Sequence, residues 1–481
     1  MTVSNLSQAA LAKKIVIRGR LELQSPLCIG SGVVPTAAQH NVDAYVLRNK
    51  DGCPYIPGTS LAGVLREAMG RDCPGREKIV DRLFGTRADS NEESNQSILD
   101  VSDILLTDST VSIRDGIAVD SYTGTVVEGK KYDYEVVDKG AAGEAEIIVT
   151  LRQRDLLPEL NDLIGALVNR LAAGFFLGGR TAKGLGRVAC RDVVAATYDF
   201  RQKSAAKAWL EYTEQDFDAW QKAIQKAKLA TCTGKAEAVP NTDGMLIEAW
   251  CGLDGSLLVA ANKSDNTQAA NEISPLEYGG GYIVPGSSVK GVLRQHAERI
   301  LRSFGCAPEI LYELMGYATD GKDDTDGEAT QKSRLYTREV YIDKNSVNTF
   351  SQGRNRIDRF TGGTVNTALF TAKALWGKAE YPEAVHLVWE ILPSRLTGKI
   401  EPWEAGLMLI LLRDIWQGRV AFGGDKGIGR GTLRGRRAKV TLAGHTYELT
   451  DKGGLSAEEQ SELNRLAAAF TAKMGEGRLQ A

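Results

Sequence analysis

The sequence predicts two consecutive α+β units that share one order of strands and helices. Three observations support this. At 481 residues the chain is too long for one hydrophobic core, because domains usually hold about 100–200 residues. Short motifs of the first half recur in the second half in the same order. In each half, strand-like and helix-like patterns follow the order β-α-β and then β-α-β again.

Three motifs carry the repeat. YIPGTSLAGVLR at Tyr55–Arg66 recurs as YIVPGSSVKGVLR at Tyr282–Arg294, VDSYTG at Val119–Gly124 as IDRFTG at Ile357–Gly362, and GLGR at Gly184–Arg187 as GIGR at Gly427–Arg430. The separation grows from 228 residues at the first motif to 243 residues at the last. Matches in the same order with a slowly growing separation indicate a duplication with small insertions.

Each unit begins with a strand, at about 14–24 and about 245–251, and a loop then leads to a Pro-Gly step and a helix, at about 58–70 and about 286–302. Alternating apolar residues predict a later strand over Glu144–Leu151 and over Ala384–Ile391. The next helix has one apolar face, made by Leu160, Leu163, Ile164, Leu167, Val168 and Leu171, and its counterpart spans Pro402–Ile415. A glycine-rich loop and a last strand end each unit. This is the order of a split βαβ, ferredoxin-like domain, which is also the topology of the RRM.

The predicted boundaries are a first domain over 1–200, a helical segment and linker over 201–243, a second domain over 244–441 and a C-terminal tail with a helix over 442–481. Lys203–Lys228 has helical spacing, whereas Thr231–Gly244 is polar and contains Pro240. Ser456 and Glu459 have the spacing of a capping box, which predicts the start of the C-terminal helix.

The composition indicates a soluble globular protein, with 43% hydrophobic and 25% charged residues. No apolar stretch reaches the roughly 18 residues of a membrane span, and the N-terminal segment lacks the apolar core of a signal peptide. We therefore expect a cytoplasmic protein with no membrane partner. The seven cysteines and four histidines show no metal-ligand spacing, so we expect reduced thiols and no zinc site.

A net charge of −2 argues by itself against a nucleic-acid partner. The segment from Arg419 to Lys439, however, holds seven basic residues and one acid, Asp425. A basic stripe on a nearly neutral protein suits an extended polyanion. The alternative is an ordinary solvated face.

In both units the Pro-Gly step opens a helix whose Ser or Thr is predicted at the N-cap. Free backbone N–H groups and the positive end of the helix dipole would then face outward and suit a phosphate. The alternative is that the motif only caps the helix. The residues predicted to contact RNA from these helices are Gly58, Thr59, Ser60 and Arg66 in the first unit and Ser287, Ser288, Lys290 and Arg294 in the second.

The two glycine loops, Gly178–Arg187 and Gly423–Arg430, lie between a helix and a strand. Glycines let a backbone lie flush against a ligand. The charges predicted to contact RNA there are Arg180, Lys183, Arg187, Lys426 and Arg430. The alternative is a tight helix-to-strand turn, and the G-x-x-x-x-G-K-[ST] pattern of a triphosphate loop is absent.

These segments together resemble the signature of the RAMP superfamily of CRISPR-associated proteins, over roughly residues 14–195 and 245–440. Two such units in one chain resemble the fused double backbone subunits of type III CRISPR effector complexes. The resemblance implies ferredoxin-like RAMP domains with inserted β-hairpin thumbs, in an antiviral ribonucleoprotein. The implied partners are CRISPR RNA, target RNA and other type III subunits, including a large polymerase-like subunit.

The middle hairpins, near 113–137 and 354–371, carry the repeated Asp-x-[Tyr/Phe]-Thr-Gly element and correspond to the thumbs. We expect them to reach across the RNA, with an aromatic ring stacking on a base or wedging beside one. The residues assigned to this contact are Tyr122, Thr123, Arg359, Phe360 and Thr361. The alternative is that the two aromatic rings are packed in a core.

The resemblance also implies endoribonuclease activity on target RNA by an aspartate in a pattern like Asp-x-x-Val-x-Arg, which Asp43, Val46 and Arg48 match. A carboxylate there can hold Mg²⁺ (or Mn²⁺) near the scissile phosphate or orient the ribose 2′-hydroxyl. Without the resemblance, Asp43 would be taken for a solvated loop residue.

The second unit is predicted to bind without cutting. Asp43 stands 14 residues before Pro57, and the same count back from Pro285 gives Asn271, whose amide cannot replace a carboxylate. Glu272 and Asp265 are weaker catalytic candidates.

The sequence leaves two alternatives. A binding-only scaffold subunit is the main alternative. Gly423-Gly-Asp425 is similar to the two-metal motif of polymerase palms, but the next residue is Lys426 and the first unit has Arg180 in place of the acid.

Overall fold

The structure is a computed structural model that describes residues 8–32, 42–86, 95–120, 122–212, 216–235, 244–260, 272–317, 331–365, 370–394 and 396–477. The chain divides into two units. Unit 1 consists of Met1–Arg114, Asp133–Thr181 and Leu185–Val239, and unit 2 of Asp115–Tyr132, Ala182–Gly184 and Pro240–Ala481. Both units mix helices with antiparallel sheets, which confirms the predicted α+β class.

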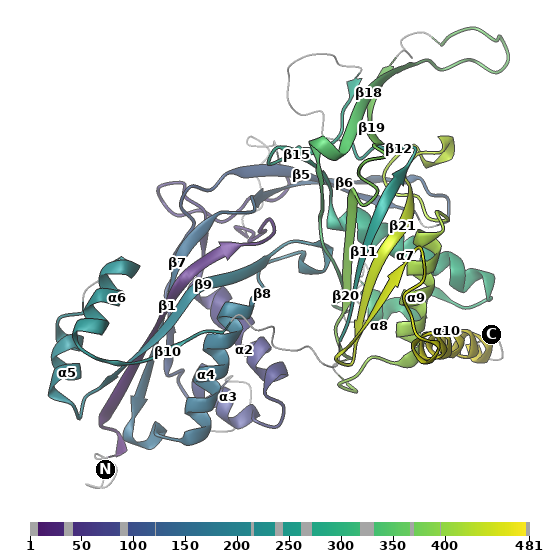
Figure 1. Ribbon diagram of the computed structural model, residues 1–481. Helices are drawn as coiled ribbons and strands as arrows, with labels where there is room; N and C mark the ends of the chain where they lie inside the picture. Colours follow the sequence, from purple (N-terminus) through teal and green to yellow (C-terminus); the bar gives the residue numbers. More distant parts are fainter. Residues whose placement is uncertain are drawn as a thin grey trace, which may run out of the picture. The chain divides into compact units, whose positions relative to one another are not determined.

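The sheet of unit 1 is built around β1 (Leu11–Leu23), which pairs antiparallel with β7 (Ala142–Arg152) and β9 (Arg187–Asp199) (Figure 1). β3 (Leu99–Val101) lies beyond β7, and β10 (Ala230–Thr233) lies beyond β9, in the order β10-β9-β1-β7-β3. The strands expected at 14–24 and at 144–151 are therefore confirmed. The polar linker expected from Thr231 is wrong at its start, because β10 hydrogen-bonds to β9 there.

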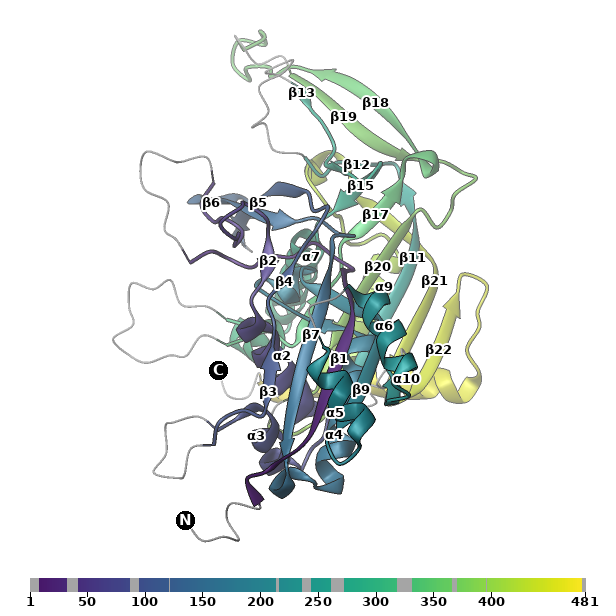
Figure 2. The same ribbon diagram turned by 90° about the vertical axis from the view of Figure 1, so that its left-hand side faces the viewer.

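Helices cover both faces of this sheet (Figures 1 and 2). On one face, α2 (Gly58–Asp72), α3 (Glu77–Phe84) and α4 (Pro158–Ala173) bury their apolar side chains against β1 and β7. On the other face, α5 (Lys203–Leu210) and α6 (Phe217–Lys226) pack over Val16, Ala196 and Tyr198. The helical segment after the last core strand is thus part of unit 1.

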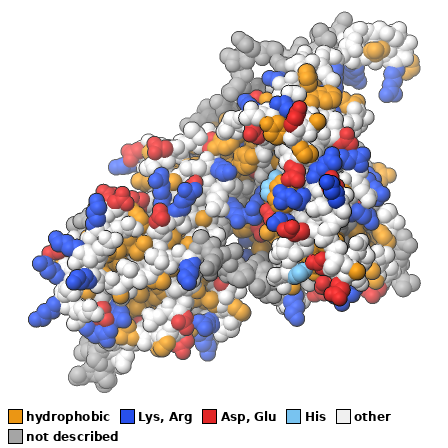
Figure 3. Space-filling view, in the orientation of Figure 1, with side chains coloured by type: hydrophobic (Ala, Val, Ile, Leu, Met, Phe, Trp, Pro, Cys, Tyr) orange, Lys and Arg blue, Asp and Glu red, His pale blue; other side chains and the backbone are white. Residues whose placement is uncertain are grey.

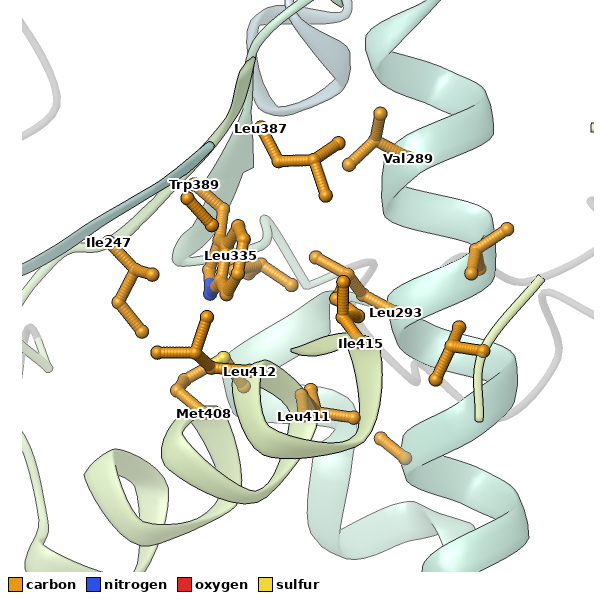
Figure 4. Packing of buried hydrophobic residues seen from close by; sticks show 14 of the residues in the cluster. Ile247, Val289, Leu293, Leu335, Leu387, Trp389, Met408, Leu411, Leu412 and Ile415 are labelled. Atoms are coloured by element: carbon orange, nitrogen blue, oxygen red, sulfur yellow. The ribbon is translucent and has the colours of Figure 1, made fainter. Parts of the chain in front are cut away.

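The main sheet of unit 2 repeats this arrangement. β11 (Met245–Asp254) pairs antiparallel with β20 (Val385–Ile391) and β21 (Thr432–Leu442), and the order is β16-β20-β11-β21-β22, with β16 at Leu335–Thr337 and β22 at His445–Thr450. Its core lies against α7 (Gly286–Ser303) and α9 (Pro402–Trp416), where Trp389 and Leu335 of the sheet meet Leu293 and Met408 of the helices (Figure 4). The C-terminal helix α10 (Ala457–Gly477) packs against α9.

The remaining elements are short strands, two long hairpins and one short helix. In the first copy they are β2 (Tyr55–Ile56), β4 (Ile104–Leu105), β5 (Val111–Val119), β6 (Val126–Val137) and β8 (Phe175–Phe176). In the second copy they are β12 (Ser256–Leu257), β13 (Glu272–Ile273), β14 (Glu277–Tyr278), β15 (Gly281–Val284), β17 (Val340–Asp343), β18 (Val347–Arg354), β19 (Phe370–Gly377) and α8 (Tyr312–Met315). Among the described helices, none is both long and apolar enough to cross a membrane.

In each unit a side-chain contact to a carboxylate links the two core helices, but the carboxylate lies on the earlier helix in unit 1 and on the later helix in unit 2. In unit 1, Arg170 of α4 donates to Asp72 of α2, with 2.6 Å between Nε and Oδ2. In unit 2, Asp414 of α9 pairs with His296 of α7 at 2.9 Å, and both side chains are buried. The duplicated fold thus keeps the link between the helices while its chemistry has changed.

We expect Trp220→Ala to destabilise unit 1 by about 3–5 kcal/mol, the usual cost of removing a large buried ring. Trp220 is 1% exposed, and its indole N–H donates to the Tyr198 hydroxyl at 3.2 Å. Urea unfolding with hydrogen exchange as the readout measures the effect, which should speed exchange in β1 and β9 before β11. Leu210→Ala, at a side chain 84% exposed in α5, is the control and should change stability by under about 0.5 kcal/mol. Equal losses in the two variants would contradict the packing described above.

Candidate nucleic-acid interface

Each glycine loop is held against the segment that follows the first core strand by backbone hydrogen bonds. In unit 1, the N–H of Gly186 donates to the Pro26 carbonyl and that of Gly179 to the Cys28 carbonyl, both at 2.7 Å. The bonds recur in unit 2, from Gly431 to Ser256 at 2.7 Å and from Gly424 to Leu258 at 2.8 Å. The loops are therefore tight turns of fixed geometry, and the turn interpretation and the binding interpretation are compatible.

One residue of each loop adopts the left-handed conformation without being glycine and reaches the hairpin of its own copy. Arg180 has φ 58°, and its guanidinium lies 4.3 Å from the centre of the Tyr134 ring, at the base of β6. Asp425 has φ 57° and pairs with Arg354 of β18 at 2.8 Å. The same position of each glycine loop thus anchors the hairpin of its copy, through β6 in the first copy and through β18 in the second.

The loop charges are not equally available to a ligand. Lys183 and Lys426 are exposed, and Arg187 is half-buried with its Nε donating to Gln24 at 3.0 Å. Arg430, in contrast, is 2% exposed and donates to Gln352 of β18 at 2.7 Å. The prediction that Arg430 contacts RNA is wrong for this structure, because its side chain is used to hold the hairpin.

The predicted N-caps are also wrong. Pro57 and Pro285 occupy the N-cap positions of α2 and α7, and neither helix has a side-chain cap. At α2 the Asp103 carboxylate accepts the N–H of Gly58 at 2.8 Å. An acid at this helix start repels a phosphate, so the dipole argument fails for α2.

The other helix residues predicted to bind RNA differ in their exposure and in their ion pairs. Thr59 is exposed, whereas Ser60, Ser287 and Ser288 are half-buried in the first helical turns. Arg66 pairs with Asp81 at 2.5 Å, and Arg294 with Glu298 at 2.9 Å. These arginines are partly neutralised within their own units.

Lys290 lies inside unit 2 rather than on its surface. It is 8% exposed, and its ammonium donates to the Ser333 hydroxyl at 2.6 Å and to the Leu335 carbonyl at 2.9 Å. Burial lowers its pKa to about 7, because the charged form loses water. The prediction that Lys290 contacts RNA is therefore wrong for this structure.

The hairpin tips present the repeated aromatic residues to solvent. In the first hairpin, one Asp120 oxygen accepts the N–H of Tyr122 at 3.0 Å, and it accepts both the N–H of Thr123 at 2.6 Å and its hydroxyl at 2.9 Å. These bonds, above all those from Thr123, lower the pKa of Asp120. Tyr122 is 85% exposed, so the packed-core alternative is wrong for this ring.

The second hairpin has the same tip. Asp358 accepts the N–H of Phe360 at 3.0 Å, the N–H of Thr361 at 2.8 Å and the Thr361 hydroxyl at 3.0 Å, and its pKa is lowered for the same reason. Phe360 is 99% exposed, and Arg359 beside it is exposed as well. The role of the two aspartates was not predicted, although their fixed spacing to the threonine is the signal of such a turn.

Asp43 lies at the base of the first hairpin. Its N–H donates to the Asp133 carbonyl at 3.0 Å, and its Oδ2 accepts the Asp133 N–H at 2.7 Å, while the residue stays exposed. Close by, Arg48 binds Glu135 through two hydrogen bonds of 2.7 and 3.1 Å. The matched pattern therefore packs against β6, a contact that sequence reasoning did not anticipate.

The strand register identifies the counterpart of Asp43 as Glu272, not Asn271. Ala44 pairs in parallel with Tyr134, three residues before Val137, and Ile273 pairs in parallel with Ala372, three residues before Leu375. Val137 and Leu375 are equivalent, because each pairs with the segment after the first core strand, at Leu27 and Leu257. Counting back from the proline was therefore wrong by one residue. Asp265 lies outside the described residues.

The basic stripe is locally neutralised, which favours the solvated-face interpretation. Six of its seven basic residues pair with a carboxylate, and Figure 3 shows both signs of charge on the visible surface. The pairs are Arg419–Asp414, Arg430–Asp425, Arg434–Asp254, Arg436–Asp451, Arg437–Glu383 and Lys439–Glu448. Five of these six acids lie outside the segment from Arg419 to Lys439, so a count within that segment overstated the free charge.

Comparison with known families identifies the chain. The family model of the RAMP superfamily matches residues 20–189 and 252–434, once in each copy. The chain belongs to the RAMP superfamily. This membership supports an RNA-binding role in a CRISPR system and two fused RAMP units. None of the curated proteins matches the chain.

We expect Lys290→Met to change the pH dependence of unit 2 stability. The folded-state pKa of about 7 lies below the ordinary value of 10.5, so the unfolded state binds more protons between these values. Wild-type stability should therefore rise with pH across this window, with a slope of at most about 1.4 kcal/mol per pH unit from this group. Methionine cannot titrate, so the variant lacks this pH-dependent contribution to the unfolding free energy. In urea unfolding, the unfolding free energy of the wild type minus that of the variant should therefore increase from pH 7 to pH 10.

Lys452→Met, at an exposed lysine, serves as the control and should leave the slope unchanged. A Lys290→Met variant whose stability follows that of the wild type in parallel across the window would show that Lys290 does not titrate there.

Proposed function

We propose that this RAMP protein is a CRISPR RNA-binding backbone subunit of a type III effector complex, with metal-dependent cleavage of target RNA by its first unit. Each unit would be a ferredoxin-like palm, which the orders β9-β1-β7-β3 and β21-β11-β20-β16 support. CRISPR RNA, target RNA and further effector subunits, including a large polymerase-like one, are the partners. The setting would be cytoplasmic.

The observation that carries the proposal is the pair of exposed aromatic rings, Tyr122 and Phe360, on identical aspartate-capped turns. A ring that is 85% or 99% exposed contributes nothing to the core, yet the turn beneath it is held by three hydrogen bonds in each copy. Rigid exposed rings can stack on bases of any identity. This suits a subunit that binds guide RNA without reading its sequence.

Asp43 is the proposed cleaving residue. Among the described residues, no group of three His, Cys, Asp or Glu side chains is placed to hold a metal ion. Mg²⁺ (or Mn²⁺) is commonly held by one or two carboxylates together with phosphate oxygens of the substrate, so a single carboxylate fits that mode. Asp43 would hold the ion, which would stabilise charge at the scissile phosphate. The Asp133 N–H, which donates to Oδ2 of Asp43 at 2.7 Å, orients the carboxylate.

A binding-only scaffold subunit is the alternative, and the firm attachment of Asp43 to the hairpin favours it. In that case the carboxylate only fixes the second half of β6, by accepting the Asp133 N–H at 2.7 Å.

We expect Tyr122→Ala and Phe360→Ala each to weaken binding of single-stranded RNA by about 1–3 kcal/mol, the value of one stacked base. Neither change should alter the unfolding free energy by more than about 0.5 kcal/mol, because both rings are exposed. Fluorescence anisotropy with RNAs of several sequences measures the affinity. Hydrogen exchange at both tips should slow when RNA is added.

Leu396→Ala, at another exposed apolar side chain in unit 2, provides the control. If the tip variants bound RNA as tightly as this control, or if exchange at the tips were unchanged by RNA, the hairpins would not be the RNA contact.

We expect Asp43→Asn to abolish one cut in matched target RNA within the assembled complex, while binding of guide and target persists. The amide oxygen can still accept the Asp133 N–H, so the fold of the loop is kept and only the negative charge is lost. Gel analysis of end-labelled target with Mg²⁺ measures the loss.

Glu272→Gln tests the second unit in the same assay. Persistence of every other cut would agree with cleavage by the first unit alone, whereas loss of a distinct cut would show that both units cleave. Full cleavage by Asp43→Asn would instead favour the scaffold alternative.

A further inference from the structure

Unit 2 has a surface hollow at one end of its main sheet. The hollow, ≈ 320 Å³ in volume, lies at the end of β11 beside the turn between β19 and β20. Its lining includes Gly252, Asp254, Lys378, Tyr381, Arg434 and Arg436. Three cationic side chains thus face one carboxylate, Asp254, which accepts a hydrogen bond from Arg434 at 2.9 Å.

The strand register shows how the two copies differ here. In unit 1, Glu22 lies opposite Ala189, next to the pair Leu23 and Val188. In unit 2 the corresponding pair is Gly252 and Arg434, next to Leu253 and Leu433. A glutamate has thus become a glycine, and an alanine has become an arginine.

Arg436 makes only a long ion pair. In unit 1, Arg191 lies opposite Arg20 and pairs with Glu22 at 2.5 Å. Arg20 corresponds to Trp250, whose partner in the register is Arg437, and Arg437 pairs with Glu383 at 3.2 Å. The carboxylate paired with Arg436, on Asp451, is 3.7 Å away and beyond hydrogen-bond distance. Arg436 is also the extra residue of a bulge in β21, opposite the step from Trp250 to Cys251. Bulges commonly redirect a side chain toward a site.

The far wall of the hollow is an insertion. Val137 and Ala142 of the first copy correspond to Leu375 and Ala384 of the second, so the turn is four residues longer there. The added turn contributes Lys378, whose ammonium donates to the Asn345 carbonyl at 2.6 Å, and Tyr381.

We propose that this hollow binds a phosphate group through Arg434, Arg436 and Lys378. Arginine forks match the oxygens of phosphate in pairs, and the absent side chain at Gly252 lets such a group approach the strand. A base is not expected to stack beside it, because the Trp250 ring is already flanked by His386 at 4.3 Å and by Arg437 at 3.7 Å from the strands on either side. The phosphate is either an internal phosphate of an RNA strand or a terminal phosphate.

The test compares the full chain with an Arg434→Ala, Arg436→Gln double variant. Alanine is the residue that unit 1 has at the first of these positions, so the fold should tolerate it. The matched control, Arg465→Gln with Lys473→Gln on α10, removes the same charge at exposed positions. Inorganic phosphate, followed by ³¹P line broadening, is the first probe. RNA oligonucleotides with a 5′-hydroxyl or a 5′-phosphate are the second and third.

The double variant, but not the control, should lose the phosphate line broadening. If the ligand is an internal RNA phosphate, affinity for both oligonucleotides should fall about tenfold, and the salt slope should flatten by about 0.7 for each lost contact. If it is a terminal phosphate, only the preference for the 5′-phosphate should vanish. Equal behaviour of double variant and control with all three probes would overturn the proposal. If the wild type bound inorganic phosphate but no RNA, the proposed function would be contradicted, whereas the assignment of the hollow as a phosphate site would stand.

Discussion

The backbone hydrogen bonds between each glycine loop and the segment after the first core strand are the constraint on which the rest of each copy depends. Only glycine is tolerated at their centre. Gly186 has φ 75°, and a side chain there would lie 1.9 Å from the Leu177 carbonyl; Gly431, at φ 87°, would meet the Phe422 carbonyl at the same distance. The segment so held also pairs with the hairpin, at Leu27–Val137 in the first copy. Loop, hairpin and the stretch around Asp43 therefore share one anchor.

Because this anchor is made of backbone, the side chains around it were free to diverge between the copies. The left-handed residue of the loop reaches its hairpin through an arginine on a ring in one copy and through an ion pair in the other, at Arg180 and Asp425. In the contact between the two core helices, the carboxylate likewise moved from one helix to the other, from Asp72 to Asp414. The duplicated backbone arrangement is kept while the side-chain contacts around it have changed. This explains why the glycine motifs recur in both copies, whereas the side chains that contact the hairpins do not.

Sequence patterns predicted the elements well, because periodicity and glycine placement are local properties. Helix starts at Pro57 and Pro285 and the strands on both sides of each loop follow directly from them. The capping box of Ser456 and Glu459 is confirmed by two reciprocal hydrogen bonds, of 2.8 and 3.2 Å. Charge and the caps of α2 and α7 were predicted poorly. The partners that decide them are distant in sequence, as with Asp254 and Arg434, 180 residues apart, or Gly58 and Asp103, 45 residues apart. Composition within a window cannot contain such pairs, and it therefore overstated the free charge of the stripe and of Arg430.

Equivalence between the copies follows strand register rather than spacing along the chain. The bridge from Arg48 to Pro54 corresponds to the pair Glu277 and Tyr282, and the turn it closes is one residue shorter in the second copy. This shift made Asn271 the apparent counterpart of Asp43, although a carboxylate, Glu272, occupies that register. The copies differ in the support of this segment, which in the first copy consists of hydrogen bonds from the residues that follow Asp43 to a glutamate of the hairpin. In the first copy, the N–H of Val46 and the guanidinium of Arg48 both bind Glu135, at 3.0 and 2.7 Å. In the second, Pro275 has no N–H to donate, and Glu277 has the opposite charge and binds Lys344 at 2.6 Å. The unequal role proposed for the two copies thus rests on the lost support and not on a lost carboxylate.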